Sequence, residues 1–288
     1  MKHRRQRPSK FPMKPAPTKT PPHARRPDGS SARAPRSGDS GSSQIEIVMG
    51  RNCIEELLKH DPARIREVFL AETRGDASHG RKSALREAIE QAGIPVRECA
   101  RHELEQMVQS DSHQGIVARV KPRVHLSFEQ LLEQARERTS IRLLALDGVL
   151  DPQNVGAVLR AAECFGVDAV IWSKNRGAAF GPVVSKVSVG ASEIVPLCPV
   201  PNLHRAIEAL KEVGVWSIGA VVSPKAVALK ELDAPQKWVL VMGSEGEGIQ
   251  HLIEQNLDFR VYIKMLGAIS SLNVSQATAV FLHAMAER

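Results

Sequence analysis

Residues 261–275 read V-Y-I-K-M-L-G-A-I-S-S-L-N-V-S and lie directly before a last apolar segment. The β-branched and aromatic residues at 261–265 predict a short strand. Gly267 permits backbone geometry that other residues resist, and Ser271 and Asn273 offer side-chain hydrogen-bonding groups where a helix begins. The stretch therefore predicts a strand, a polar loop and a helix. Taken alone, Ser271 or Asn273 is best explained as a cap of that helix.

Strands and helices alternate through the second half of the chain, which predicts a parallel α/β sheet. Residues 141–146 form a nearly continuous apolar strand, of the kind that is buried on both faces of such a sheet. Open sheets of this kind bind ligands beyond the carboxyl ends of their strands. The later strands are expected at residues 169–172, 215–220, 238–242 and 261–265.

The junction at residues 151–162, D-P-Q-N-V-G-A-V-L-R-A-A, leads from the strand at 141–146 into a helix expected over residues 155–165. Its apolar residues recur at the spacing of a buried helical stripe, which leaves Arg160 off the stripe and Asn154 at the N-cap. For each of these two residues alone, a solvated charge and a cap are the simpler explanations. The stripe consists of Val155, Val158, Leu159 and Ala162.

A glycine-rich turn, M-G-S-E-G-E-G-I at residues 242–249, follows another strand and leads into another helix. Its glycine order differs from G-x-G-x-x-G, and it lacks the Lys-Ser/Thr pair of a P-loop. These differences argue against a different α/β enzyme that hydrolyses a nucleotide. One glycine-rich turn is by itself a weak indication of function.

Residues 44–121 predict a small α/β domain in which four short strands alternate with three helices. Residues 122–140 follow as a linker and a helix, which begins with a capping box formed by Ser127 and Gln130. Four polar residues lie at loop ends of the small domain, where a turn or a cap is the simpler role. These residues are Arg51, Asn52, His113 and Gln114.

The composition, 42% apolar and 25% charged over 288 residues, is that of a globular protein with about two domains. No run approaches the roughly 18 apolar residues that a membrane span needs, which argues against an integral membrane protein. The scattered cysteines, without C-x-x-C or H-E-x-x-H, argue against a zinc site and a disulfide framework and fit a reducing cytosol best. The cysteines are Cys53, Cys99, Cys164 and Cys198.

The positive charge is concentrated in residues 1–43, which hold eleven Lys or Arg and two acidic residues, a net +9 against +7 for the whole chain. This segment is rich in Pro, Ser and Arg and has few apolar residues, so we expect it to be disordered. A basic arm attracts phosphate backbones and speeds encounter with nucleic acid. A solvated leader without function and an Arg-rich transit peptide are the alternatives, although scattered prolines disfavour the transit peptide's helix.

Together the three polar junctions, at residues 151–162, 242–249 and 263–275, resemble in order, content and spacing the signature motifs of one family. It is the SpoU family, also called TrmH, of RNA ribose 2′-O-methyltransferases. The resemblance covers residue 142 to the C-terminus. The preceding domain, with G-R-N-C-I-E-E-L-L at 50–58 and H-Q-G-I-V-A at 113–118, is similar to the L30e-like substrate-binding domain of the family's ribosomal-RNA members.

The resemblance implies a small L30e-like α/β domain at residues 44–121, then a parallel-sheet trefoil-knot (SPOUT) methyltransferase domain at residues 141–288. It also implies S-adenosylmethionine as cofactor, no metal, and an obligate homodimer, which we expect to form through the last helix. The implied partner is RNA, and the implied substrate is a guanosine in the peptidyl-transferase P loop of 23S rRNA. The expected location is the cytoplasm.

The family's motifs imply roles for individual residues. Arg160 matches the catalytic arginine, and because a guanidinium stays charged at physiological pH, we expect it to stabilise charge rather than act as a base. Lys264 replaces the family's usual proline, which restores a backbone N–H and adds a charge. The expected catalytic residues are Asn154, Arg160, Glu245, Ser271 and Asn273. The expected cofactor-binding residues are Gly243, Gly248, Ile263, Met265 and Leu272. The expected RNA contacts are Arg51, Asn52, His113 and Gln114.

Two other functions stay open on the sequence. The enzyme implied by the resemblance could methylate another site in ribosomal or transfer RNA. A non-catalytic RNA-binding or ribosome-assembly protein would keep the basic segment and the first domain but would not need Arg160, Glu245 and Asn273 together. The joint presence of these three residues favours the enzyme.

Overall fold

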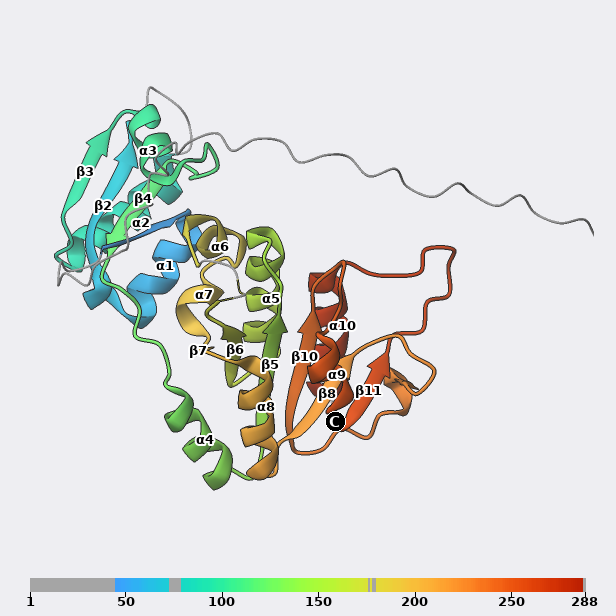
Figure 1. Ribbon diagram of the computed structural model, residues 1–288. Helices are drawn as coiled ribbons and strands as arrows, with labels where there is room; N and C mark the ends of the chain where they lie inside the picture. The colour runs from blue at the N-terminus through green and yellow to red at the C-terminus, as the bar shows by residue number, and fades with distance from the viewer. Residues whose placement is uncertain (1–44, 73–78, 176, 178–179, 287–288) are drawn as a thin grey trace, which may run out of the picture. The chain divides into compact units, whose positions relative to one another are not determined.

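The computed structural model describes residues 45–72, 79–175, 177 and 180–286 (Figure 1). The predicted disordered basic segment lies outside these residues. The described strands form two sheets, one of four strands before residue 121 and one of seven strands after residue 140.

The four-stranded sheet has the order β1-β4-β2-β3, and helices pack on both of its faces. Strand β4 pairs antiparallel with β1 and β2, whereas β2 and β3 are parallel. Ile54, Leu57 and Ile89 pack on one face and Leu104 on the other. The predicted alternation of strands and helices is thus present, whereas the bounds 44–121 of a separate domain stay a prediction. Its elements are β1 (Glu46–Met49), α1 (Arg51–His60), η1 (Pro62–Arg64), β2 (Ile65–Ala71), α2 (His79–Gln91), β3 (Val96–Cys99), α3 (Arg101–Val108) and β4 (Ile116–Val120).

The seven-stranded sheet has the order β7-β6-β5-β10-β8-β11-β9, and all of its pairings are parallel. The predicted parallel sheet is therefore confirmed. Two strands were not predicted, because β7 contains a proline and β9 has only two residues. The strands are β5 (Ile141–Asp147), β6 (Ala169–Ser173), β7 (Leu197–Val200), β8 (Trp216–Ala220), β9 (Val227–Ala228), β10 (Lys237–Gly243) and β11 (Phe259–Tyr262).

Helices cover both faces of this sheet, and each face has its own apolar core. On one face, Val158 and Leu159 pack with Phe281 and Leu282. The opposite core holds Leu131 with residues of the other helices. Helices α5 and α10 cover the first face, and α4, α8 and α9 cover the second. The helices are α4 (Phe128–Glu137), α5 (Pro152–Cys164), α6 (Pro182–Val187), α7 (Ala191–Ile194), α8 (Leu203–Glu212), α9 (His251–Gln255) and α10 (Val274–Ala286), with the short η2 (Leu229–Glu231).

Two elements that lead to the polar junctions, α5 and β11, have bounds that differ from the predicted ones. Helix α5 begins at Pro152 rather than at residue 155, because the Asp151 side chain accepts a hydrogen bond from the Gln153 N–H and Pro152 fits the first helical position. Asn154 is therefore inside the first turn and is not the N-cap. Strand β11 ends at Tyr262, where its pairing with β9 stops, so residues 263–265 belong to the loop.

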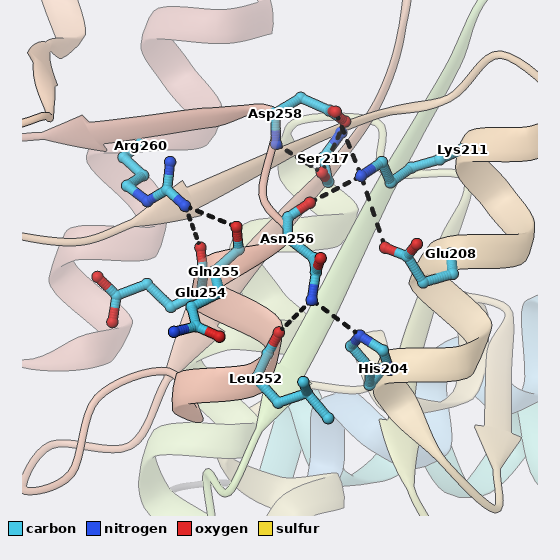
Figure 2. A network of polar contacts seen from close by, with 10 residues as sticks. All are labelled: His204, Glu208, Lys211, Ser217, Leu252, Glu254, Gln255, Asn256, Asp258 and Arg260. Atoms are coloured by element: carbon cyan, nitrogen blue, oxygen red, sulfur yellow. Dashed lines mark hydrogen bonds and ion pairs between the residues drawn. The ribbon is translucent and has the colours of Figure 1, made fainter.

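A network of polar contacts lies at the amino-terminal ends of β8 and β11 (Figure 2). Asp258 accepts hydrogen bonds from the N–H and the hydroxyl of Ser217, at 2.9 and 2.7 Å, and forms an ion pair with Lys211 at 3.3 Å. Lys211 also donates to the carbonyl of Asn256 at 2.7 Å. These contacts join α8, β8 and the α9–β11 turn at the edge away from the strands' carboxyl ends.

Candidate active site

The three polar junctions meet at the carboxyl edge of the parallel sheet, because they follow β5, β10 and β11. A cavity of about 520 Å³ lies there, within the rough 300–1,000 Å³ range of small-molecule sites. Figure 1 shows the long loop between β11 and α10 projecting beside this edge. All five expected cofactor-binding residues line the cavity, as do Glu245, Ser271 and Asn273.

One residue from each junction contributes to a closed set of hydrogen bonds, which we call the motif triangle: Asn154, Glu245 and Asn273. The Asn273 Nδ2 donates to Asn154 Oδ1 at 2.9 Å and to Glu245 Oε1 at 2.5 Å. The Asn154 Nδ2 donates to the same Glu245 oxygen at 3.1 Å. Glu245 Oε2 has no hydrogen-bond partner within the part of the chain that the structure describes. The triangle fixes one carboxylate oxygen and leaves the other open to a ligand.

Asn273 has a second role at the start of α10. Its Oδ1 accepts hydrogen bonds from the N–H and the hydroxyl of Ser275, at 2.8 and 2.6 Å. The predicted helix cap is therefore confirmed, whereas the catalytic role of this residue stays a prediction. One side of the amide caps the helix, while the other side joins the motif triangle.

The glycine-rich turn is closed by two backbone hydrogen bonds between Ser244 and Gly248, at 3.1 and 3.0 Å. A Cβ on Gly243 would lie 2.1 Å from the carbonyl carbon of Gly248, so this position admits only glycine without a backbone shift. Buried Asp147, opposite Gly243 in the β5–β10 pairing, accepts hydrogen bonds from the backbone and side chain of Gln250. Asp147 was not among the predicted site residues, because its only signal in the sequence is an acidic residue at the end of an apolar strand.

The loop after β11 offers unpaired backbone groups to the cavity. Within the described residues, positions 264–272 make no hydrogen bond through their backbone. Ser271 is exposed and lines the cavity, and Lys264 is exposed outside it. Groups of this kind are satisfied by water or by a bound ligand.

Arg160 is not brought together with the other expected catalytic residues. Its side chain lies on the exposed side of α5, does not line the cavity and has no partner among the described residues. The stripe residues of α5, by contrast, are at most 1% exposed. Four of the five expected catalytic residues thus share one site, and the fifth faces solvent on the helix that supplies Asn154.

The expected RNA contacts of the first domain meet at the start of α1. Gln114 accepts a hydrogen bond from the Arg51 N–H at 3.1 Å, and Asn52 is exposed beside them. His113 is fully buried, and its Nδ1 accepts a hydrogen bond from the Gly115 N–H at 3.0 Å. Burial, with Arg101 nearby, lowers the pKa of His113. In this conformation His113 shapes the turn that presents Gln114 and does not itself reach the surface.

Comparison with known proteins shows to which family this chain belongs. The SpoU rRNA Methylase family matches residues 141–283, and the family described as RNA 2'-O ribose methyltransferase substrate binding matches residues 47–126. The 23S rRNA (guanosine-2'-O-)-methyltransferase RlmB of Pseudomonas aeruginosa is 42% identical over 242 residues, which cover 83% of this chain and 95% of that protein. The chain belongs to the SpoU rRNA methylase family. The resemblance of the three junctions is thereby confirmed.

Solved structures share the SpoU fold. An AdoMet-bound rRNA methyltransferase from Sinorhizobium meliloti has a TM-score of 0.66 at 19% identity, over 84% of this chain and 87% of that one. The SpoU methyltransferase AviRb from Streptomyces viridochromogenes, in complex with AdoMet, also has a TM-score of 0.66, at 20% identity over 84% and 89%. These likenesses confirm the predicted SpoU-type α/β class. The trefoil knot and the L30e-like character of the first domain stay predictions.

Two further findings concern the described part of this SpoU chain. None of its helices combines the length and apolarity that a membrane crossing requires. In the same residues, no three His, Cys, Asp or Glu side chains are grouped so as to hold a metal ion.

Proposed function

We propose that this chain transfers a methyl group from S-adenosylmethionine to the ribose 2′-hydroxyl of a guanosine in 23S rRNA, in the peptidyl-transferase P loop. The observation that carries the proposal is the motif triangle, which joins the three family motifs beside one cavity. The named activity of the RlmB relatives supports the choice of RNA and nucleoside.

The cavity fits the cofactor by size and by chemistry. Apolar side chains such as Val261, Ile263 and Phe281 provide a wall for the adenine ring, and the unpaired backbone groups of 264–272 provide hydrogen bonds. Gly243, which lines the cavity, lets the end of β10 pack against the backbone of Gly248 and so permits the tight turn beside the ligand. When bound, the cofactor supplies an electrophilic methyl group on a sulfonium. The residues that would hold it are Gly243, Gly248, Ile263, Met265 and Leu272.

Glu245 orients the attacking hydroxyl in this proposal. The two amides of the motif triangle fix its Oε1, so that Oε2 is free to accept a hydrogen bond from the ribose 2′-hydroxyl. Because the reaction needs the hydroxyl oxygen in line with the methyl group, a fixed acceptor lowers the entropic cost of reaching that geometry. Ser271, exposed at the cavity, contributes a further hydroxyl at the same place.

Arg160 acts on the RNA rather than on the cofactor. Its guanidinium is exposed and has no partner in the described part of the chain, which suits a residue that binds a phosphate and stabilises negative charge on the ribose oxygen. The first domain supplies the remaining RNA contacts through Arg51, Asn52 and Gln114, while His113 keeps their turn in shape. The basic segment at 1–43 adds non-specific attraction to phosphates.

We further propose a homodimer, because apolar residues near the cavity remain exposed. Ile269 is 78% exposed on the loop before α10, and Val280 on α10 is 40% exposed. A second copy of this chain would cover them. With this substrate, we propose that the protein acts in the cytoplasm.

Mapping of 2′-O-methylation in ribosomal RNA, from cells with and without this protein, tests the proposal. We expect one guanosine of the peptidyl-transferase P loop to lose its methyl group when the protein is absent. Complementation with Glu245→Gln should not restore it. An unchanged map would contradict the proposal and favour a non-catalytic RNA-binding protein.

A further inference from the structure

Four charged side chains gather where the first domain contacts α6 and α7 of the methylase domain. We call them the junction cluster: Glu46, Arg64, Arg123 and Glu193. Arg64 Nη1 forms an ion pair with Glu193 Oε2 at 2.8 Å, and these two side chains are only 10% and 9% exposed. The pair joins residues 129 positions apart, one in η1 and one in α7.

The other two members surround this pair. Arg64 Nη2 lies 3.6 Å from Glu46 Oε2, and Arg64 Nε donates to the carbonyl of Lys121 at 3.2 Å. Arg123, in the linker, donates from Nη2 to the carbonyl of Val195 at 2.6 Å, just after α7. Arg64 thus contacts Glu46 and Lys121 of its own domain and Glu193 of the methylase domain.

The junction cluster contributes little to stability, but it favours one relative orientation of the two surfaces that it joins. Burial of an ion pair costs desolvation that the attraction only partly offsets. Here Arg64 Nη2 and Arg123 Nη1 are buried and have no hydrogen-bond partner among the residues that the structure describes. Such a pair restricts two surfaces to one orientation, because a small slide would leave a buried charge uncompensated.

Helices α6 and α7 are in direct contact with α5, the helix that supplies Asn154. A Cβ on Gly156 of α5 would lie 2.6 Å from the Val187 Cβ of α6, so the two helices approach closely. On the other side, a Cβ on Gly190 would lie 2.9 Å from Cγ of Glu56 in α1. Met49 of β1 also donates its N–H to Ser185 Oγ in α6 at 3.3 Å. The segment from α6 to α7 therefore connects the first domain to the helix that supplies Asn154.

We propose that Arg64 and Glu193 are positioning residues, which hold the first domain in the one orientation that presents bound RNA to the cofactor cavity. This inference rests on the proposed function and adds to it how the two domains act together. Without the pair, RNA still binds the first domain and cofactor still binds the cavity, but the ribose reaches the methyl group less often.

The test compares Glu193→Gln, which keeps the side chain's shape, and Arg64→Gln with a matched control, Arg66→Gln. Arg66 is exposed two residues further on and has no partner among the described residues. At saturating RNA and cofactor, we expect both cluster variants to lower the single-turnover rate of methyl transfer about 10-fold or more, since small misplacements of reacting groups cost up to ~10²-fold. Affinities for an RNA fragment and for S-adenosylmethionine should stay within about twofold, and the control should match wild type.

A second measurement reports the relative orientation of the two domains directly and does not depend on methyl transfer. Nitroxide labels at His102→Cys and Glu212→Cys, in a Cys164→Ser background, report the distance between the two domains by pulsed dipolar spectroscopy. We expect a narrow distribution in wild type and a broad one in Glu193→Gln. An unchanged distribution, or an unchanged transfer rate in folded Glu193→Gln, overturns the inference. A wild-type protein that transfers no methyl group would instead count against the proposed function, and the label distances would still test the cluster.

Discussion

Asn273 donates a hydrogen bond to Asn154 at 2.9 Å, although the two residues are 119 positions apart. The same side chain caps α10 through its other amide atom. This hydrogen bond thereby fixes the position of the start of α10 relative to the first polar junction. The geometry of the site consequently depends on contacts that no single motif contains.

Asn273→Asp separates the two roles of this residue. Aspartate keeps an oxygen to cap α10, but it loses both donated hydrogen bonds and places a second negative charge beside Glu245. We expect methyl transfer to fall roughly 10²-fold or more, while the thermal unfolding temperature stays near wild type. Asn273→Ala, which also removes the cap, should cost about 1 kcal/mol of stability in addition. Wild-type turnover in Asn273→Asp would exclude the motif triangle from catalysis.

Two glycines of the same turn give a matched pair for cofactor binding. Gly243→Ala places a methyl group against the backbone of Gly248 and must shift the turn, whereas a Cβ on Gly246 meets nothing within 4 Å. We expect calorimetry to show a loss of roughly tenfold or more in S-adenosylmethionine affinity for Gly243→Ala, equivalent to about 1.4 kcal/mol. Gly246→Ala should bind normally. Equal affinities in the two variants would place the cofactor elsewhere.

Arg160→Ala tests the residue that lies apart from the cavity. If its guanidinium stabilises the ribose oxygen, the single-turnover rate should fall roughly 10²-fold with cofactor affinity unchanged. Arg160→Lys should also be slow, because one ammonium lacks the planar set of donors. Arg136→Ala, at another exposed helical arginine, is the control. Transfer at the wild-type rate in Arg160→Ala would show that its role has been assigned wrongly.

The network in Figure 2 predicts a stability effect without a loss of function. Asp258→Ala leaves the buried Ser217 N–H and hydroxyl without their acceptor, which should cost about 1–3 kcal/mol in chemical denaturation. Asp233→Ala, at an exposed acid that has no partner among the described residues, should stay within about 0.5 kcal/mol. Methyl transfer per folded molecule should be unchanged in both variants. Equal stability of the two variants would show that the network does not stabilise the fold.

The parallel sheet could be predicted from the sequence because its longer strands are recognisable by their apolar composition alone. Residues 141–146 are apolar throughout, and the α5 stripe is buried as its spacing required. Short strands escaped prediction since β7 and β9 owe their pairing to neighbours rather than to composition. The start of α5 was misplaced because Asp151 competes with Asn154 as a cap, and only the folded backbone decides between them.

Local sequence patterns could not predict side-chain contacts between residues that are far apart in the chain. The family's motifs identified Asn154, Glu245 and Asn273, but not that one carboxylate oxygen accepts from both amides. His113 looked like a polar loop residue, yet it is fully buried. Nothing local to Arg64 points to Glu193, because the two meet only after both domains have folded.

The most direct test of the central claim is methyl transfer by the purified protein to a 23S rRNA fragment, with S-adenosylmethionine and no added metal. We expect one methyl group per fragment on a guanosine ribose, no transfer when that ribose is 2′-deoxy, and a rate at least roughly 10²-fold lower for Glu245→Gln. Methylation of the 2′-deoxy fragment, or no transfer by a protein that binds both RNA and cofactor, would contradict the account.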